Sequence, residues 1–186
     1  MKILPLKILA VSGSLRAASY NTALLHATRE LAPEELSIEI FDGLGDLPFF
    51  NQDLEEQGEP APVAAWKTAV READGLLIAC PEYNGGLTAV LKNAIDWASR
   101  GKPAPLDGKL ACAIGASPGI TGTVRAQDAL RLNLKRTGCD LAPLSDVLVG
   151  QAPGKFENGV LTDERTRQGI ARHLAAFAAV LRSRTV

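Results

Sequence analysis

Residues 12–21 read SGSLRAASYN and combine groups that bind phosphate in proteins: three serine hydroxyls, a guanidinium and a carboxamide. They follow an apolar run at 6–11 and precede a segment with helical spacing, which predicts a strand, a turn and a helix start. Free backbone N–H groups and the positive helix end favour an anion at such a turn, and Arg16 can donate two parallel hydrogen bonds to phosphate oxygens. The segment therefore predicts a phosphate site. The alternative is that Ser19 only caps the helix while Arg16 points into water.

The kind of phosphate compound follows from what this segment lacks. Gly13 is its only glycine, whereas a dinucleotide site has G-x-G-x-x-G and a Walker loop has G-x-x-x-x-G-K-[ST]. Asp42 stands near the end of the second apolar run, where dinucleotide sites place an acid that binds ribose. Without the glycines, Asp42 is interpreted as a turn residue. Side-chain hydroxyls around a single phosphate favour a mononucleotide.

A second loop, PEYNGG at 81–86, follows the clearest buried strand of the sequence, GLLIAC at 75–80. Gly85 and Gly86 allow the backbone to come close to a flat ligand, and Tyr83 offers a ring. Such residues also build ordinary turns, so this loop alone identifies nothing. Beside the phosphate loop it describes one pocket, with a phosphate at one end and a flat ring over exposed amides at the other.

A third loop, GASPG at 115–119, matches G-x-S-x-G, the nucleophile elbow of hydrolases. In that elbow the N–H of the residue after the serine helps to form the oxyanion hole, but here Pro118 follows Ser117 and has no N–H. The helix that an elbow enters at once is delayed, and the only later histidine, His173, falls in the terminal helix. A hydrolase is therefore excluded, and Ser117 is interpreted as a hydrogen-bonding residue at the rim of the ring pocket.

These three loops can form one site only if the fold brings them to the same edge of a sheet. The hydrophobic periodicity of the chain predicts such a fold. The expected strands are 6–11, 36–41, 75–80, 109–116 and 146–149, with 36–41 near an edge, and the expected helices are 20–31, 63–73, 88–99, 123–137 and 163–182. About five strand–helix units predict an α/β protein with an open, doubly wound parallel sheet covered on both faces. Ligands of such sheets bind beyond the carboxyl ends of the strands.

Residues 42–62 are rich in glycine, proline and acids, and we interpret this long connection as a functional flap or a small helical turn. Asp96 and Arg100 have the i, i+4 spacing that favours an ion pair on one helix. Trp66 and Trp97 are expected to pack helices, with Trp97 also a candidate for a subunit contact.

Composition limits the function further. The 186 residues are 46% hydrophobic and 22% charged, which is ordinary for a globular protein, and one domain over 1–186 is expected. With 20 basic and 21 acidic residues, the net charge of −1 gives no general footprint for nucleic acid or an anionic membrane. Three scattered cysteines and two distant histidines, His26 and His173, form no disulfide framework and offer almost no metal ligands. Both histidines are expected at helix surfaces or boundaries, and Cys80 and Cys112 as small buried hydrophobes.

The N-terminal apolar run is interrupted by Lys7 and lacks a signal-peptide cleavage site. No apolar stretch approaches the ~20 residues of a membrane span. A reduced, cytoplasmic protein is therefore expected, without metal and without membrane insertion.

Two motifs, in this order, resemble those of the NADPH-dependent FMN reductases, including their quinone and chromate reductase branch. The first is GSLR at 13–16 with Ser19 and Asn21, and the second is PEYNG at 81–85 with LKNAIDW at 91–97. The resemblance spans nearly the whole chain and implies a flavodoxin-like five-stranded fold, bound FMN and hydride transfer from NADPH or NADH. It also implies a homodimer or homotetramer with flavin sites near subunit contacts.

The resemblance also implies which residues hold the cofactor. By motif matching, the phosphate is bound by Ser14, Arg16, Ser19 and Asn21, and the ring is lined by Pro81, Glu82, Tyr83, Asn84 and Gly85, with Ser117 at its far edge. Many members have a serine or histidine where this chain has Gly85-Gly86, which leaves the shape above the flavin, and hence the acceptor, open. Because the flavin accepts the hydride, no catalytic side chain is expected.

The function expected from this resemblance is a reductase that passes electrons from NAD(P)H through FMN to quinones, chromate, azo compounds or free flavin, by a ping-pong reaction at one open flavin face. The alternative is a flavodoxin-like electron carrier without NAD(P)H turnover, although such carriers are usually strongly acidic. Arg16 and Arg100 are both candidates for the second phosphate of NADPH.

Overall fold

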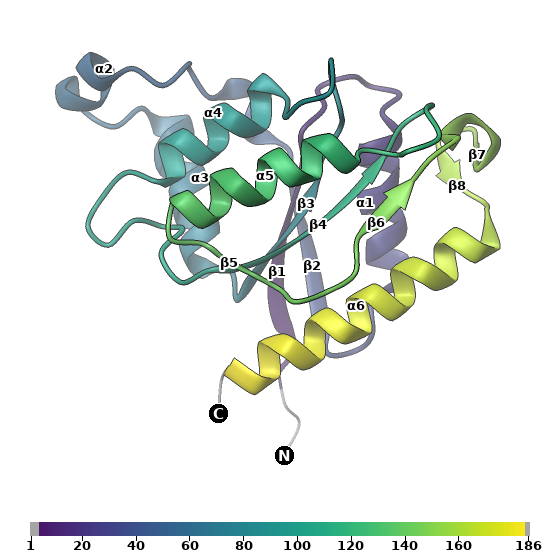
Figure 1. The fold of residues 1–186 in the computed structure, drawn as a ribbon. Helices are drawn as coiled ribbons and strands as arrows, with labels where there is room; N and C mark the ends of the chain where they lie inside the picture. Colours follow the sequence, from purple (N-terminus) through teal and green to yellow (C-terminus); the bar gives the residue numbers. More distant parts are fainter. Residues whose placement is uncertain (1–3, 185–186) are drawn as a thin grey trace.

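The computed structural model describes residues 4–184 and has a central parallel sheet between two layers of helices (Figure 1). The strands are β1 (Leu6–Ser12), β2 (Leu36–Phe41), β3 (Gly75–Ala79), β4 (Leu110–Ala116), β5 (Asp140–Leu141), β6 (Val147–Val149), β7 (Phe156–Glu157) and β8 (Val160–Leu161). The helices are α1 (Tyr20–Leu31), α2 (Gln52–Gln57), α3 (Ala61–Glu72), α4 (Ala89–Ala98), α5 (Val124–Arg136) and α6 (Glu164–Arg184), with 3-10 turns η1 (Gly43–Asp46) and η2 (Ala152–Gly154). The strand order is β2-β1-β3-β4-β5, which confirms the doubly wound α/β prediction.

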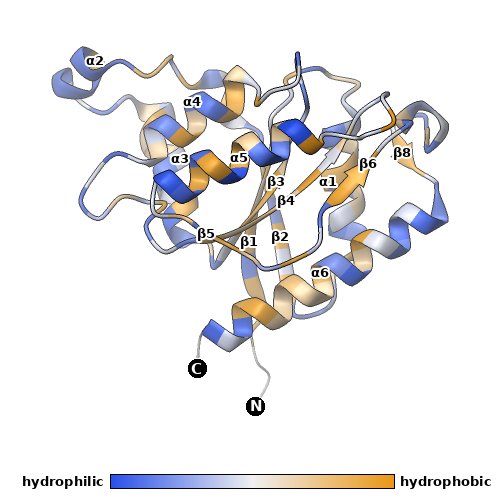
Figure 2. Ribbon diagram, viewed as in Figure 1, coloured by the Kyte–Doolittle hydropathy of each residue, from blue (hydrophilic) through white to orange (hydrophobic). Residues whose placement is uncertain are grey.

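Both faces of the sheet are buried, and successive residues of β1 show how. Ile8 and Ala10 pack on one face with α1 and α6, whereas Leu9 and Val11 pack on the other face with α3, α4 and α5. The strands therefore have near-continuous apolar runs, as expected for parallel strands covered on both sides. Figure 2 shows the same arrangement, with the apolar colour along the strands and hydrophilic residues along the outer sides of the helices.

The periodicity located the main elements well. The bounds predicted for α1 and β2 are those observed, and β2 lies at an edge of the sheet as expected. The predicted fifth strand is β6, but β5 was missed. Both lie beside β4: β5 pairs at Leu110 and Ala111, and β6 pairs at 114–116. A strand of two residues is too short for a hydrophobic pattern to reveal, and so are the strands of the small β7–β8 hairpin.

The ion pair predicted on α4 was wrong. Asp96 binds Lys92 on its own helix, and Arg100 instead binds Glu55, 45 residues earlier in the sequence. Trp97 is 0% exposed in the core, which confirms that it packs helices and rules out the further suggestion that it forms a subunit contact.

Residues 42–62 contain η1 and α2, which confirms the helical-turn interpretation. The backbone of 47–50 is held by α4: Asn93 accepts from Phe50 N at 2.8 Å, and Trp97 Nε1 donates to Pro48 O at 2.7 Å. We call residues 47–59 the strap. None of the helices within residues 4–184 is long and apolar enough to cross a membrane.

Candidate functional site

The loops after β1 and β3 meet where the order of the sheet reverses, because β2 lies on one side of β1 and β3 on the other. Gly13 marks their contact. A Cβ atom there would lie 2.5 Å from Leu91 Cδ1 and 2.8 Å from Pro81 Cδ, so only glycine fits. Thr88 Oγ1 donates to Gly13 O at 2.9 Å and caps α4, which ties the first loop to this helix. Such a switch point is where ligands bind in open α/β sheets.

The first loop presents unused donors. The N–H groups of residues 15, 17, 18 and 20 have no acceptor within residues 4–184. Arg16 is exposed, forms no ion pair within the same range, and its Cζ lies 5.6 Å from the centre of the Tyr20 ring. Ser14 is buried, and its Oγ accepts from Arg16 N at 3.3 Å. A phosphate is the group that such a set of N–H donors and one guanidinium fits.

Ser19 and Asn21 have structural tasks in this loop. The Ser19 hydroxyl caps α1 by accepting from Asn21 N and Thr22 N, as the alternative reading of the sequence proposed. The Asn21 carboxamide is buried and binds the main chain of Ala116 twice, with its Oδ1 accepting and its Nδ2 donating at 2.9 Å each. Asn21 thereby joins the start of α1 to the end of β4.

The second loop is a tight turn. Tyr83 and Gly86 exchange two backbone hydrogen bonds, and Asn84 and Gly85 between them have positive φ angles of 52° and 73°. This is the Asn-Gly pattern of a type I′ turn. It directs Tyr83, 53% exposed, toward the first loop, where its hydroxyl lies 3.3 Å from Ser14 Oγ. The N–H groups of residues 82, 84 and 85 have no acceptor within the described chain, so the exposed amides predicted for a flat ring are present.

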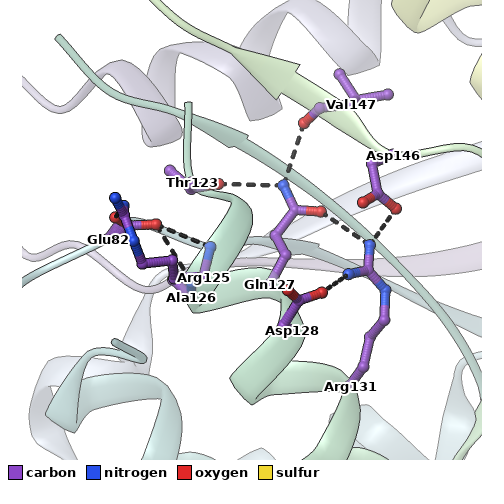
Figure 3. A network of polar contacts seen from close by, with 9 residues as sticks. All are labelled: Glu82, Thr123, Arg125, Ala126, Gln127, Asp128, Arg131, Asp146 and Val147. Carbon is purple, nitrogen blue, oxygen red and sulfur yellow. Dashed lines mark hydrogen bonds and ion pairs between the residues drawn. The ribbon is translucent and has the colours of Figure 1, made fainter. Parts of the chain in front are cut away.

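Glu82 does not point at this turn. Its carboxylate accepts from the backbone N–H groups of Arg125 and Ala126 at 3.0 and 3.3 Å, and it forms an ion pair with the Arg125 side chain at 2.5 Å (Figure 3). The carboxylate therefore caps the start of α5 and locks the second loop to it. Glu82 lies three residues after the end of β3, and nothing in the sequence identified α5 as its partner.

Ser117, in the third loop, is also committed within the chain. Its hydroxyl donates to Gly122 O at 2.6 Å and its N–H to Val149 O at 3.0 Å. The N–H groups of 119–122 have no acceptor within the described residues and are the free donors of this loop. The geometry of a nucleophile elbow is not present, since Pro118 follows Ser117 and α5 begins only at Val124.

Pro81 is buried beside Gly13 and so shapes the floor between the loops. Cys80 precedes it and is buried; burial, with the negative charge of Glu82 adding to it, raises the pKa of the Cys80 thiol to about 12. A thiol with that pKa is not a nucleophile at neutral pH. No group of side chains that could hold a metal ion occurs in the described part of the chain.

Sequence reasoning missed the roles of Asn93, Trp97 and Arg100 around the strap. Arg100 Nε lies 3.0 Å from both carboxylate oxygens of Glu55, and its Cζ lies 5.5 Å from the centre of the Phe50 ring. This hydrogen bond lowers the pKa of Glu55. Arg100 is thus occupied by the strap, which leaves Arg16 as the unpaired member of the two arginines considered for a second phosphate.

Comparison with known proteins agrees with this geometry. A family described as NADPH-dependent FMN reductase matches residues 6–154. An NAD(P)H-dependent FMN reductase of Pseudomonas aeruginosa is 42% identical over 175 residues, covering 92% of this chain and 93% of the relative. A 2-hydroxy-1,4-benzoquinone reductase of a Burkholderia species is 38% identical over 183 residues, covering 97% and 99%. Among solved structures, the flavoenzyme NAD(P)H:(acceptor) oxidoreductase FerB of Paracoccus denitrificans has a TM-score of 0.86 at 31% identity, covering 96% of this chain and 98% of that one.

Proposed function

Because the chain belongs to the NADPH-dependent FMN reductase family, we propose that it passes electrons from NAD(P)H through bound FMN to a quinone. It is an NAD(P)H-dependent oxidoreductase, and its cofactor is FMN. The observation that carries the proposal is the set of unpaired N–H groups of residues 15, 17, 18 and 20 beside those of residues 82, 84 and 85, with the Arg16 side chain next to the first set. A phosphate and the polar edge of a flat ring match these two donor sets.

In this proposal some residues of the first loop contact the phosphate of FMN, and others hold the loop in shape. The Arg16 side chain and the amides of residues 15, 17, 18 and 20 hold the phosphate, with Ser14 lining the same loop. Ser19 and Asn21 fix the shape of that loop through the helix cap and the contact with Ala116. These two were expected as direct phosphate ligands, and the hydrogen bonds observed support an indirect role.

The ring lies against the second loop in this proposal. Pro81, Tyr83, Asn84 and Gly85 line it, and Glu82 keeps the loop in place from behind through α5. The third loop, with Ser117, borders the far edge. When bound, FMN supplies the acceptor for the hydride and returns the electrons to the second substrate, so the chain needs no side-chain base.

Packing of one ring face on the loops leaves one face for both substrates. Nicotinamide and quinone therefore bind in turn, and we propose a ping-pong reaction. Double-reciprocal plots at several quinone concentrations should be parallel, and high quinone should inhibit competitively against NAD(P)H. Intersecting lines would show that both substrates bind together and would contradict this order.

The phosphate assignment is tested by Arg16→Ala. Loss of a charge-assisted hydrogen bond costs about 1.5–3 kcal/mol, so the Kd for FMN should rise by about tenfold to a hundredfold. Arg29→Ala, at the other end of α1, is the matched control and should bind FMN as the unchanged protein does. Unaltered FMN affinity in Arg16→Ala, or extraction of FAD from the purified protein, would refute the site.

The proposed transfer of electrons from NAD(P)H to a quinone is tested by following the absorbance of the bound flavin. NAD(P)H alone should bleach the yellow protein under anaerobic conditions, and a quinone should restore the colour. Chromate, azo compounds and free flavin are further acceptors to compare in the same assay. A yellow protein that NAD(P)H does not bleach would favour the electron-carrier alternative.

A homodimer or homotetramer and a cytoplasmic location complete the proposal. Light scattering at micromolar protein tests the assembly, and a monomeric mass would exclude it. Exposed apolar side chains support an assembly, among them Phe49 on the strap and Ile120 in the third loop.

A further inference from the structure

A cleft of about 820 Å³ lies between residues 143–149 and the first half of α6, and none of its lining residues belongs to the three loops of the flavin site. Figure 1 shows these two segments at the side of the sheet where β6 runs beside α6. The volume is in the range of small-molecule pockets, about 300–1,000 Å³. The established activity gives this cleft no task.

The α6 wall of the cleft is one face of the helix. Arg165, Gly169, Arg172 and Ala176 follow one another at spacings of four, three and four, and His173 stands beside them. Gly169 lies in the helix interior, where glycine is destabilising relative to alanine. A Cβ atom there would meet nothing within 4 Å, so the packing of this chain does not require the glycine. Its effect is to leave the cleft open along the backbone of α6.

His173 provides an independent sign of a ligand. The residue is 8% exposed, lines the cleft, and its Nε2 is buried with no hydrogen-bond partner in the described chain. The backbone of Ser145 raises the pKa of His173, an interaction that Nε2 does not make because it has no partner. With the proton placed on Nδ1, Nε2 is an acceptor. Buried polar atoms are rarely left unpaired in native proteins. A ligand that donates a hydrogen bond would satisfy this one.

The charges around the cleft favour an anion. Its cations are Lys155, Arg165 and Arg172, and the side chains of the two arginines form no hydrogen bond or ion pair with any residue in 4–184. Two carboxylates also line the cleft. Asp146 binds Arg131 on α5 (Figure 3). Asp163 accepts from Thr166 at the start of α6 and attracts Lys155 and Arg165, so its negative charge remains in the lining. The three cations still outnumber the two carboxylates. The positive end of the α6 dipole adds to the same potential.

We propose that this cleft is a second ligand site, separate from the flavin, for a small organic anion that also carries a hydrogen-bond donor. The anionic group lies at Arg172 and Arg165, the donor faces His173 Nε2, and the apolar body lies over Gly169 and along Leu144 and Val147. The proposal does not depend on the identity of the electron acceptor.

The probe for the test is 8-anilinonaphthalene-1-sulfonate, which has an anionic group, one N–H donor and apolar rings. Its fluorescence is titrated against the FMN-loaded protein, so that the flavin site is filled. Gly169→Phe should abolish binding because its ring occupies the cleft without touching the core. Arg172→Gln should weaken binding by about tenfold or more, the usual loss for a charge-assisted hydrogen bond. NAD(P)H turnover should be unchanged in both variants.

Two matched controls isolate the cleft. Gly169→Ala leaves it open, and Arg136→Gln removes an exposed arginine from the end of α5; both should bind the dye as the unchanged protein does. Absence of binding to the unchanged protein, or equal binding by Gly169→Phe, would overturn the proposal. A lower oligomeric mass of Gly169→Phe would also overturn it, by making the cleft an interface between copies. If Gly169→Phe fails to fold, Arg172→Gln against Arg136→Gln decides the question.

Discussion

Replacing Asn21 by alanine should destabilise the protein before any flavin is bound. The Asn21 carboxamide is buried and pairs with both the N–H and the C=O of Ala116, 95 residues later in the sequence. Alanine removes both partners and leaves two buried main-chain groups of β4 unpaired. Each such group costs about 1–3 kcal/mol, so the free energy of unfolding should fall by about 2–6 kcal/mol. That is a large part of the stability of an ordinary domain, which is about 5–15 kcal/mol.

The measurement is urea unfolding of the flavin-free protein, and the free energy of unfolding is obtained from the midpoint and the slope of the transition. Two further variants give reference values for comparison with Asn21→Ala. Ser19→Ala removes only the cap of α1 and should cost about 1 kcal/mol. Asn133→Ala removes a carboxamide that bonds only within its own helix, to Ala129 O, and should change stability little. The expected order of destabilisation is Asn21→Ala, then Ser19→Ala, then Asn133→Ala.

The same variants distinguish a structural Asn21 from a direct phosphate ligand. A residue that only binds phosphate would leave the flavin-free protein unchanged and weaken FMN alone. Unaltered unfolding of flavin-free Asn21→Ala, together with a lower FMN affinity, would therefore refute the role we assign. A structural role predicts that both quantities fall, because the loop loses its anchor.

Two further predictions concern His173 and the strap. Burial lowers the pKa of His173, and the Ser145 carbonyl and the Asp146 carboxylate only partly oppose this. As the pH drops below about 6.5, the ordinary histidine pKa, His173 takes up a proton in the unfolded chain before it does so in the folded chain. The free energy of unfolding should therefore fall. His173→Gln should reduce the slope of this fall with pH in urea unfolding. A slope equal to that of the unchanged protein would contradict the burial argument. Arg100→Gln removes the contacts with Glu55 and Phe50 and should speed proteolytic cleavage within 47–59, and Arg136→Gln is the control. Cleavage at the original rate would mean that Asn93 and Trp97 hold the strap by themselves.

The sequence predicted those features that depend on local periodicity. Alternation along β1 and helical spacing along α1 are visible in any short window, and so are the glycine and proline positions of the three loops. From these the sheet, its covering helices and the edge that carries the loops could be placed. The resemblance of two motifs then supplied the cofactor.

The sequence could not predict partners across long separations. Asn21 was expected on a phosphate, but its amide lies against Ala116; Arg100 was expected on Asp96, but Glu55 competes for it with two oxygens. Both errors have one cause. A side chain with several donors has many possible acceptors, and only the folded backbone decides which of them comes within 3 Å. The spacing rule for helices compares neighbours on one helix and says nothing about a strap that packs over it.

The side chains around the site therefore divide into two groups. Asn21 and Glu82 are committed to the main chain of other segments, and Ser117 is committed to the main chain of its own loop. Most of the donors left free for a ligand are backbone N–H groups. The recurrent residues of the two motifs thus specify the shape of the loops more than they supply ligand contacts. Substitutions of the committed side chains should alter flavin binding by moving amides, with a loss of stability alongside. Arg16 is the exception, since its side chain forms no ion pair with any residue in 4–184 and its removal should weaken binding at unchanged stability. Comparing stability and FMN affinity across these variants separates residues that build the site from the one that binds through its own charge.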